Sequence, residues 1–181
     1  IRLSLVGSEM CIRDRVSTYE PVGYTSDSKQ QFSEGLTLTL VTEHDVTKYF
    51  EHGEKVGSSI NLARNFATMP PNLLYPESYA DYLADNFKNH PHVKGEVKDF
   101  DTLTQEGFGL LTAVGKASQR KPRLVTIEYK HPDAKFDAPI VLVGKGITYD
   151  SGGYSLKSRN GMRSMKYLSL IHIWRCRRYS L

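Results

Sequence analysis

Apolar residues recur at helical spacing in the first third of the chain and gather in short runs further on. After Asp45, a plausible helix N-cap, the spacing predicts one long helix whose apolar positions are Val46, Tyr49, Phe50, Val56, Ile60, Ala63 and Phe66. The helix should end before the prolines at 70–71, because proline cannot donate a backbone hydrogen bond and disfavours helix in the residue before it. Upstream, residues 36–42 alternate as a half-buried strand does.

The rest of the chain alternates between predicted helices and strands. Pro76 suits the first position of a second helix, whose inner face would carry Tyr79, Leu83 and Phe87. Asp101 could cap a short helix that ends at Gly107. Strands are expected at 93–100, 124–129 and 138–143, the last of them apolar enough to be buried on both faces. This alternation predicts an α/β fold with a mostly parallel sheet and helices on both faces.

The two ends of the chain differ from its middle. The codons inferred for residues 10–15 and 168–173 are reverse complements over almost their whole length, and they resemble the mosaic-end sequence of a transposase used to make sequencing libraries. We therefore expect residues 1–15 and 168–181 to be adapter-derived. These flanks hold six arginines against two acidic residues, so residues 16–167 are formally neutral although the whole chain carries +4.

The composition of residues 16–167 argues against several classes of function. A neutral segment gives no support for binding to nucleic acid or to an anionic membrane. Both cysteines, Cys11 and Cys176, lie in the flanks, so the middle can form neither a disulfide nor a thiolate metal site. No apolar run reaches membrane-spanning length. We expect a cytoplasmic protein with no nucleic-acid or membrane partner.

The most informative stretch is residues 144–157 (GKGITYDSGGYSLK), directly after the predicted core strand. Lys145, Asp150 and Lys157 would lie beyond the carboxyl end of that strand, where open α/β sheets bind ligands. Taken singly, each has a plainer interpretation: a strand-end cation, an Asx-turn and a solvated lysine. A phosphate-binding loop is disfavoured, because it requires Ser or Thr directly after the lysine and this chain has glycine there.

Residues 143–166 resemble the first metal-binding motif of the leucyl aminopeptidases, the hexameric two-metal enzymes of the cytosol aminopeptidase family. The segment from Ile60 to Pro76 is similar to the same family's pattern around its linking helix. With the adapter-like flanks, the resemblance divides the chain into five parts: adapter-like residues 1–15, the end of a small N-terminal α/β domain at 16–44, a linking helix at 45–70, the first part of the catalytic domain at 71–167, and adapter-like residues 168–181.

The resemblance implies roles for five residues. Lys145 and Asp150 would be metal ligands, the lysine as a neutral amine and the aspartate as a carboxylate between two ions. Lys157 would stay protonated and polarise the scissile carbonyl. Met162 and Met165 fall where the family lines its pocket for the first side chain of the substrate, although ordinary core packing is an equally good interpretation of Met162.

The implied reaction is the release of N-terminal amino acids, of the leucine type, from peptide substrates by two divalent ions that activate a shared water. Zn²⁺, Mn²⁺, Mg²⁺ or Co²⁺ could occupy such a mixed nitrogen and oxygen site. In the family a bicarbonate is thought to act as the base, and the enzymes are homohexamers.

The chain departs from the family pattern after residue 167. The family has a further aspartate ligand where this chain has Leu168, and the later motif with an aspartate, a glutamate and an arginine is absent from the sequence. Only two of five expected protein ligands, Lys145 and Asp150, are present, so we expect this chain to be inactive. The competing hypothesis is a non-catalytic relative with a binding or assembly role.

Two further features receive no functional interpretation from the sequence. Residues 120–123 predict a short, solvated basic turn. The histidines of the middle segment are scattered without ligand spacing: His44, His52, His90, His92 and His131.

Overall fold

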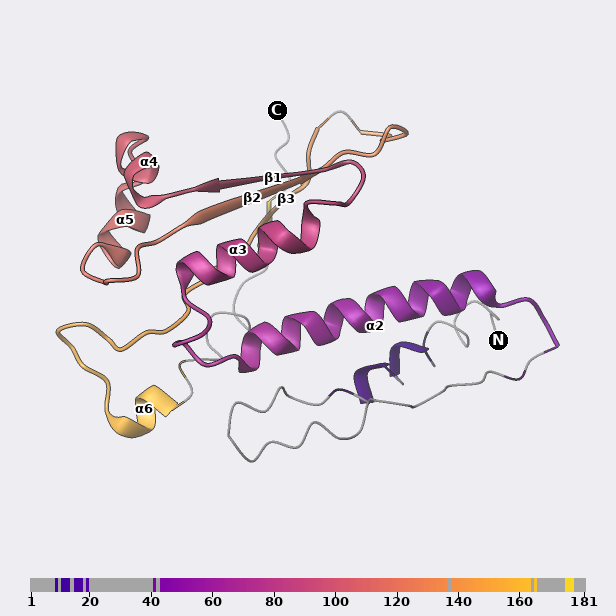
Figure 1. Ribbon diagram of the computed structural model, residues 1–181, viewed down its shortest axis with the longest axis horizontal. Coiled ribbons are helices and arrows are strands. Elements are labelled where there is room, and N and C mark those ends of the chain that lie inside the picture. The colour runs from indigo at the N-terminus through magenta and orange to yellow at the C-terminus, as the bar shows by residue number, and fades with distance from the viewer. Residues whose placement is uncertain are drawn as a thin grey trace. The chain divides into compact units, whose positions relative to one another are not determined.

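The computed structural model describes residues 43–136, 138–163 and 175–177, the last three by their backbone only, together with residues 9, 11–13, 15–17, 19, 41 and 165 (Figure 1). These residues form a mixed α/β structure with few strands. The chain divides into two compact units, Ile1–Met69 and Pro70–Leu181. The strand predicted at 36–42 lies, apart from Val41, outside the described residues.

The first unit is built on one long helix, α2 (Thr47–Thr68). This confirms the helix predicted after Asp45, and it ends before the prolines as expected. The N-cap residue is Val46, however, not Asp45. Asp45 Oδ1 instead accepts hydrogen bonds from the backbone N–H and the hydroxyl of Thr47, at 3.0 and 2.7 Å.

The described N-terminal residues lie against α2 within this unit. Asn61 Nδ2 donates to the carbonyl of Arg15 at 2.6 Å, and Arg64 Nη1 donates to that of Val16 at 2.7 Å. A Cβ added at buried Gly57 would lie 2.5 Å from Cβ of Arg15, so this close approach depends on glycine. Part of the surface that covers α2 therefore comes from Arg15, which we expect to be adapter-derived.

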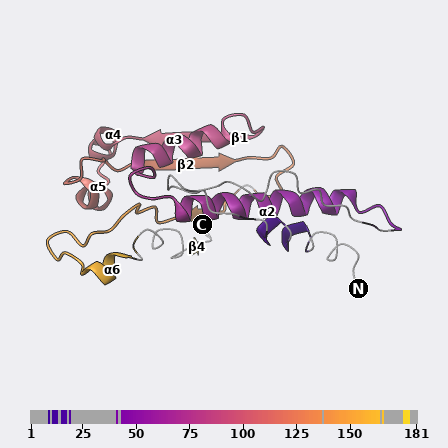
Figure 2. The same ribbon diagram turned by 60° about the horizontal axis from the view of Figure 1, so that its bottom comes forward.

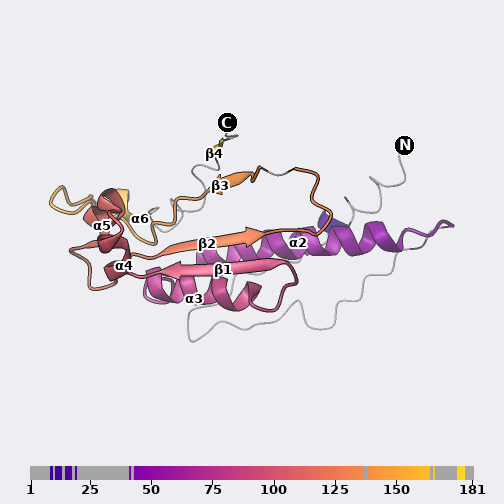
Figure 3. The same ribbon diagram turned by 90° about the horizontal axis from the view of Figure 1, so that it is seen from above.

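The second unit contains all the described strands. In chain order its elements are α3 (Pro76–Phe87), β1 (Val93–Lys98), α4 (Phe100–Gln105), α5 (Gly109–Gly115), β2 (Leu124–Tyr129), β3 (Val141–Val143), α6 (Arg159–Arg163) and β4 (Arg175–Arg177). Helix α3 lies along the β1–β2 pair, and α4 and α5 lie together at one end of it (Figures 2 and 3). Pro76 occupies the first turn of α3 as predicted.

The described strands form two antiparallel pairs, β1 with β2 and β3 with β4, and not the mostly parallel sheet that the alternation predicts. The connection from β1 to β2 explains the first pair. Helices α4 and α5 have six and seven residues, so each extends only about 10 Å, whereas a six-residue strand covers about 20 Å. Neither helix can carry the chain back along the strand, and β2 runs opposite to β1.

One face of the β1–β2 pair is apolar and the other is polar. The register places Val93 opposite Tyr129, Gly95 opposite Ile127 and Val97 opposite Val125 on one face. Charged and polar side chains dominate the other face, where Lys94 is opposite Glu128 and Glu96 is opposite Thr126. The apolar face is the one that α3 covers, because Phe87 of that helix lines a cavity together with residues of that face.

Strand β3 is shorter and more exposed than predicted. The run at 138–143 contributes a strand only at Val141–Val143, and its three side chains are 41%, 59% and 61% exposed. The prediction of a strand buried on both faces is therefore wrong for this chain. Burial requires elements packed on both sides, and among the described residues β3 pairs only with the backbone of β4.

Helix α4 begins earlier than predicted. Asp99, not Asp101, is its N-cap and accepts a hydrogen bond from the Thr102 N–H at 2.9 Å through Oδ1. Leu103 on this helix is fully buried, at 0% exposure. Gly107 then adopts a φ of 79°, the left-handed conformation expected of glycine after a helix.

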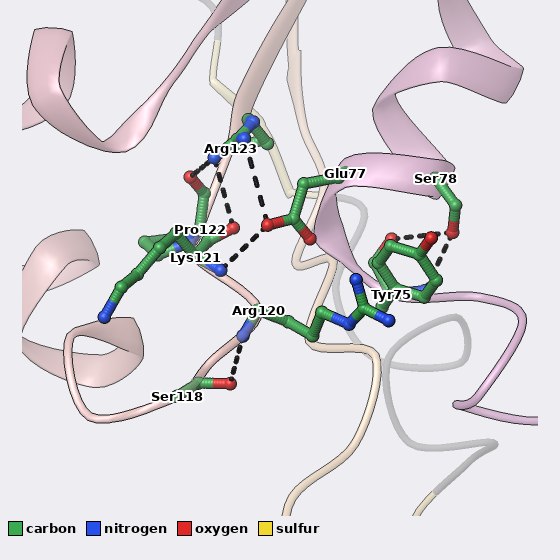
Figure 4. A network of polar contacts seen from close by, with 8 residues as sticks. All are labelled: Tyr75, Glu77, Ser78, Ser118, Arg120, Lys121, Pro122 and Arg123. Atoms are coloured by element: carbon green, nitrogen blue, oxygen red, sulfur yellow. Dashed lines mark hydrogen bonds and ion pairs between the residues drawn. The ribbon is translucent and has the colours of Figure 1, made fainter.

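The basic turn at 120–123 is not merely solvated but joins α3 to the start of β2 (Figure 4). The guanidinium of Arg120 stacks over the ring of Tyr75, with Cζ 3.8 Å from the ring centre. Glu77 Oε1 accepts a hydrogen bond from the Lys121 N–H at 3.0 Å and lies 3.8 Å from Arg123 Nη2. The prediction of a solvated turn is wrong because α3 supplies a carboxylate and an aromatic ring at the right place.

Candidate active site

The candidate residues lie on the loop that runs from the end of β3 to the start of α6. Lys145 follows β3 by two residues and is exposed. In the described part of the chain it makes no hydrogen bond or ion pair. The structure therefore does not bring Lys145 to the other two charged residues of the motif by any direct contact.

Asp150 and Lys157, in contrast, lie side by side. Lys157 Nζ is 3.5 Å from Asp150 Oδ2, and Asp150 Oδ1 accepts a hydrogen bond from the Gly152 N–H at 2.9 Å. The second contact is an Asx-turn, so the plainer interpretation of this aspartate holds in the chain. It does not compete with a ligand role, because the turn fixes the direction in which the carboxylate points.

The turn depends on glycine at one position. Gly152 has a φ of 89°, and a Cβ added to it would lie 2.4 Å from the carbonyl oxygen of Ser155 and 3.0 Å from Cγ of Lys157. Gly153 also has a positive φ, 63°, but a Cβ there would meet nothing within 4 Å. The Lys157 N–H donates to the Ser151 carbonyl at 2.9 Å and closes the loop. Of these two glycines, only Gly152 is required both because its φ is positive and because a Cβ would not fit.

The remaining candidates lie at the end of the described loop region. Met162 is half-buried in α6, where its N–H donates to the Ser158 carbonyl at 2.9 Å, and Met165 is half-buried just after the helix. Neither methionine makes a hydrogen bond to Asp150 or Lys157 in the described part of the chain. Their assignment to a substrate pocket stays a prediction.

Tyr79 of α3 lies next to the beginning of this loop, a contact that the sequence does not predict. An added Cβ at Gly146 would lie 3.9 Å from Cε1 of Tyr79. Burial raises the pKa of the Tyr79 hydroxyl above its ordinary value. Its place on the inner face of α3 follows from helical spacing, but its contact with the loop depends on tertiary structure.

The residues present do not fit a pair of divalent ions by themselves. Among the described residues, no group of three or more His, Cys, Asp or Glu side chains could hold a metal ion. One amine and one carboxylate supply too few donors for a catalytic zinc site, which has three protein ligands. No catalytic step can therefore be derived through a metal in this chain.

Comparison with known proteins identifies the family of this chain. The sequence profile of the "Cytosol aminopeptidase family, catalytic domain" matches residues 61–168, more than half of the chain. The chain belongs to the cytosol aminopeptidase family. A probable cytosol aminopeptidase of Wolbachia pipientis wMel is 38% identical over 148 residues, and another from Streptomyces griseus is 48% identical over 107 residues.

Solved structures agree with this membership. The apo structure of leucyl aminopeptidase from Trypanosoma cruzi matches 64% of this chain with a TM-score of 0.58 and 36% identity. The bottromycin maturation enzyme BotP, solved in complex with Mn, matches 91% of the chain with a TM-score of 0.69 and 26% identity. The family consists of metalloaminopeptidases that use divalent metals, in line with the Mn in BotP.

The chain covers only a part of the length of its relatives. It spans 29% of the Wolbachia protein, 22% of the Trypanosoma cruzi chain and 33% of BotP. In the part of the chain that the structure describes, no helix is long and apolar enough to cross a membrane.

Proposed function

We propose that the full-length parent of this chain is a two-metal aminopeptidase that releases N-terminal amino acids, of the leucine type, from peptides. The observation that carries the proposal is the unbroken motif from residue 143 to 166, which lies within the family match at 61–168. The names of the Wolbachia and Trypanosoma cruzi relatives support the same reaction class.

Each candidate residue then has a role in the parent. Lys145 and Asp150 hold the metal ions, with Asp150 aimed by its hydrogen bond from the Gly152 N–H. When bound, the ions act as Lewis acids and lower the pKa of a water that attacks the peptide bond. Lys157 is a cation beside that carboxylate, 3.5 Å away, and is placed to donate to the carbonyl oxygen of the substrate as negative charge develops there. Met162 and Met165 line the pocket for its first side chain.

Several properties of the parent follow from the same proposal. Its metals are Zn²⁺ or Mn²⁺, with Mg²⁺ and Co²⁺ as further candidates, and the Mn in BotP supports manganese. A bicarbonate serves as the base. The parent is a cytoplasmic homohexamer whose catalytic domain has a mostly parallel sheet with helices on both faces, and strand β3 becomes a buried strand within it.

The chain itself is proposed to be inactive. It offers two ligand residues, and Leu168 stands where the family has another metal-binding aspartate. The family match ends at this same residue and does not extend into residues 169–181, which supports an adapter origin for those residues. The second candidate function, a non-catalytic binding or assembly protein, is favoured only if Leu168 and the residues after it are genomic.

Two measurements test the proposal together. The first reads the source DNA across the codons for Tyr167 and residue 168 without transposase adapters. An aspartate codon at 168 is expected, and a genomic leucine codon there would favour the non-catalytic alternative. The second assays the purified chain with Mn²⁺ and a leucine anilide. No hydrolysis above that of an Asp150→Asn control is expected, and metal-dependent turnover lost in that control would overturn the claim of inactivity.

A further inference from the structure

The stretch that carries Lys145 has little in its own backbone to hold it in place. Residues 144–149 follow β3 and make no hydrogen bond or ion pair among the residues that the structure describes. The Asx-turn fixes only the far end of this stretch, through the bond from the Gly152 N–H to Asp150. The position of Lys145 therefore depends on contacts from outside the loop.

Tyr79 of α3 makes such a contact. A Cβ built at Gly146, the residue after Lys145, would lie 3.9 Å from Cε1 of the Tyr79 ring. This is a normal van der Waals separation, so the loop backbone passes alongside the ring without a clash. Gly146 does not have a positive φ, in contrast to Gly152. The contact at Gly146 is thus one of packing, whereas the turn at Gly152 is one of backbone conformation.

Helix α3 is itself firmly held, so Tyr79 offers the loop a fixed surface. Ala80, the next residue, is only 2% exposed. Glu77, two residues earlier, accepts a hydrogen bond from the Lys121 N–H at 3.0 Å and lies 3.8 Å from Arg123 Nη2. Burial also raises the pKa of the Tyr79 hydroxyl, in keeping with a side chain that is packed against its surroundings. The two ends of the stretch are therefore held in different ways, by a ring from α3 and by a turn within the loop.

We infer that Tyr79 is a positioning residue for Lys145: its ring holds the backbone at Gly146 and so restricts where the amine of Lys145 can lie. Tyr79 acts through the loop backbone, because the contact is made by a carbon of its ring. The inference rests on the proposed function, in which Lys145 takes part in the reaction of the full-length parent. A reacting group that is displaced by about 1 Å can cost on the order of 100-fold in rate.

The contact itself is tested in the chain by NMR. Tyr79→Leu removes the ring and should shift the Gly146 signals, whereas Tyr79→Phe keeps the ring and should leave them nearly unchanged. In Tyr79→Ala the backbone order parameters of Lys145 and Gly146 should fall, while that of Gly152 should stay the same because its own turn holds it. Leu83→Ala, one turn further along the inner face of α3, is the matched control and should leave the loop signals in place.

The consequence for Lys145 is tested in the full-length parent with a leucine anilide. Tyr79→Ala should lower kcat by about tenfold or more and change KM less, and Tyr79→Phe should restore kcat. Leu83→Ala should lower the urea midpoint but leave kcat close to that of the unsubstituted parent. A merely structural role of Tyr79 would make the two alanine variants behave alike, and that result would overturn the inference.

Two outcomes separate this inference from the proposed function. If the parent does not hydrolyse the anilide, or if Lys145→Ala retains full kcat, the proposed role of Lys145 fails and its positioning by Tyr79 for catalysis fails with it. If Lys145→Ala lowers kcat but Tyr79→Ala does not, the proposed function stands and the inference alone fails. Loop signals that are the same in Tyr79→Ala as in the unsubstituted chain would also overturn it.

Discussion

Residues 76–129 and residues 138–163 belong to the same unit, but they are held in place in different ways. The first region has a fully buried leucine, Leu103, and a hydrogen bond from the Lys121 N–H to Glu77 across 44 positions of sequence. The second region has an exposed strand, β3, and is ordered mainly by hydrogen bonds between near neighbours, such as that between Asp150 and Gly152.

This difference separates two properties that are easily confused. The residues that identify the family lie mostly in 138–163, whereas the contacts that can stabilise this chain lie in 76–129. A catalytic loop must leave its polar groups accessible to ligands, so it contributes little burial of its own and depends on surrounding elements for rigidity. In the described part of this chain, few elements pack against the loop.

The largest effect should come from Leu103, and it tests the comparison directly. Leu103→Ala removes a fully buried side chain and should lower the free energy of unfolding by about 2–5 kcal/mol. Leu142→Ala, in β3, removes a side chain that is 59% exposed and should change it by about 0.5 kcal/mol or less. Urea denaturation followed by circular dichroism measures both. Equal losses in the two variants would show that β3 is packed as firmly as α4.

The second effect concerns the carboxylate that joins α3 to the basic turn (Figure 4). Glu77→Ala leaves the Lys121 N–H without its acceptor and removes the partner of Arg123, so it should cost about 1–3 kcal/mol. Asp81→Ala, at an exposed position of the same helix, is the matched control and should cost almost nothing. If the two variants unfolded at the same urea concentration, the turn would be held by Arg120 stacking on Tyr75 instead.

These contrasts also show how far the sequence could predict the structure. Helices α2 and α3 and strand β2 follow from local spacing and from the prolines, which act within a few residues. The antiparallel register of β1 and β2 could not be predicted, because it depends on how little length α4 and α5 supply. The exposure of β3 could not be predicted either, since an apolar run indicates that a strand can be buried and not that anything covers it.

The site shows the same division between local and distant causes. The motif from Lys145 to Lys157 is contiguous, so the sequence could nominate its residues, and the Asx-turn at Asp150 was among the interpretations it offered. The contact between the rings of His92 and His131, whose centres are 5.7 Å apart, could not be predicted from the sequence. They meet only through the register of two strands and a left-handed backbone at His92.

A smaller, pH-dependent effect is expected at the cap of α4. The hydrogen bond from the Thr102 backbone N–H to Asp99 holds the pKa of that carboxyl below its ordinary value of 3.8. A lowered folded-state pKa contributes stability that is present above pH 3.8 and is lost as the pH falls through the folded-state value. Asp99→Asn keeps an acceptor at the cap but cannot titrate, so the stability difference between parent and variant should shrink on acidification through this range. Urea midpoints across the range measure it, and a difference that stayed constant would contradict the assignment.

The smallest effect on stability should come from the residue with the largest proposed role in catalysis. Lys157→Ala removes an ion pair whose lysine and aspartate side chains are 31% and 43% exposed, and such pairs contribute about 0–1 kcal/mol. The Asp150 turn should survive, because its bond from the Gly152 N–H does not involve Lys157. The amide shift of Gly152 and the urea midpoint of the chain should therefore both stay close to the parent values, while the same substitution in the full-length parent should lower kcat. A loss well above about 1 kcal/mol in the chain would mean that the loop is part of the stable structure, and the contrast between the two regions would then fail.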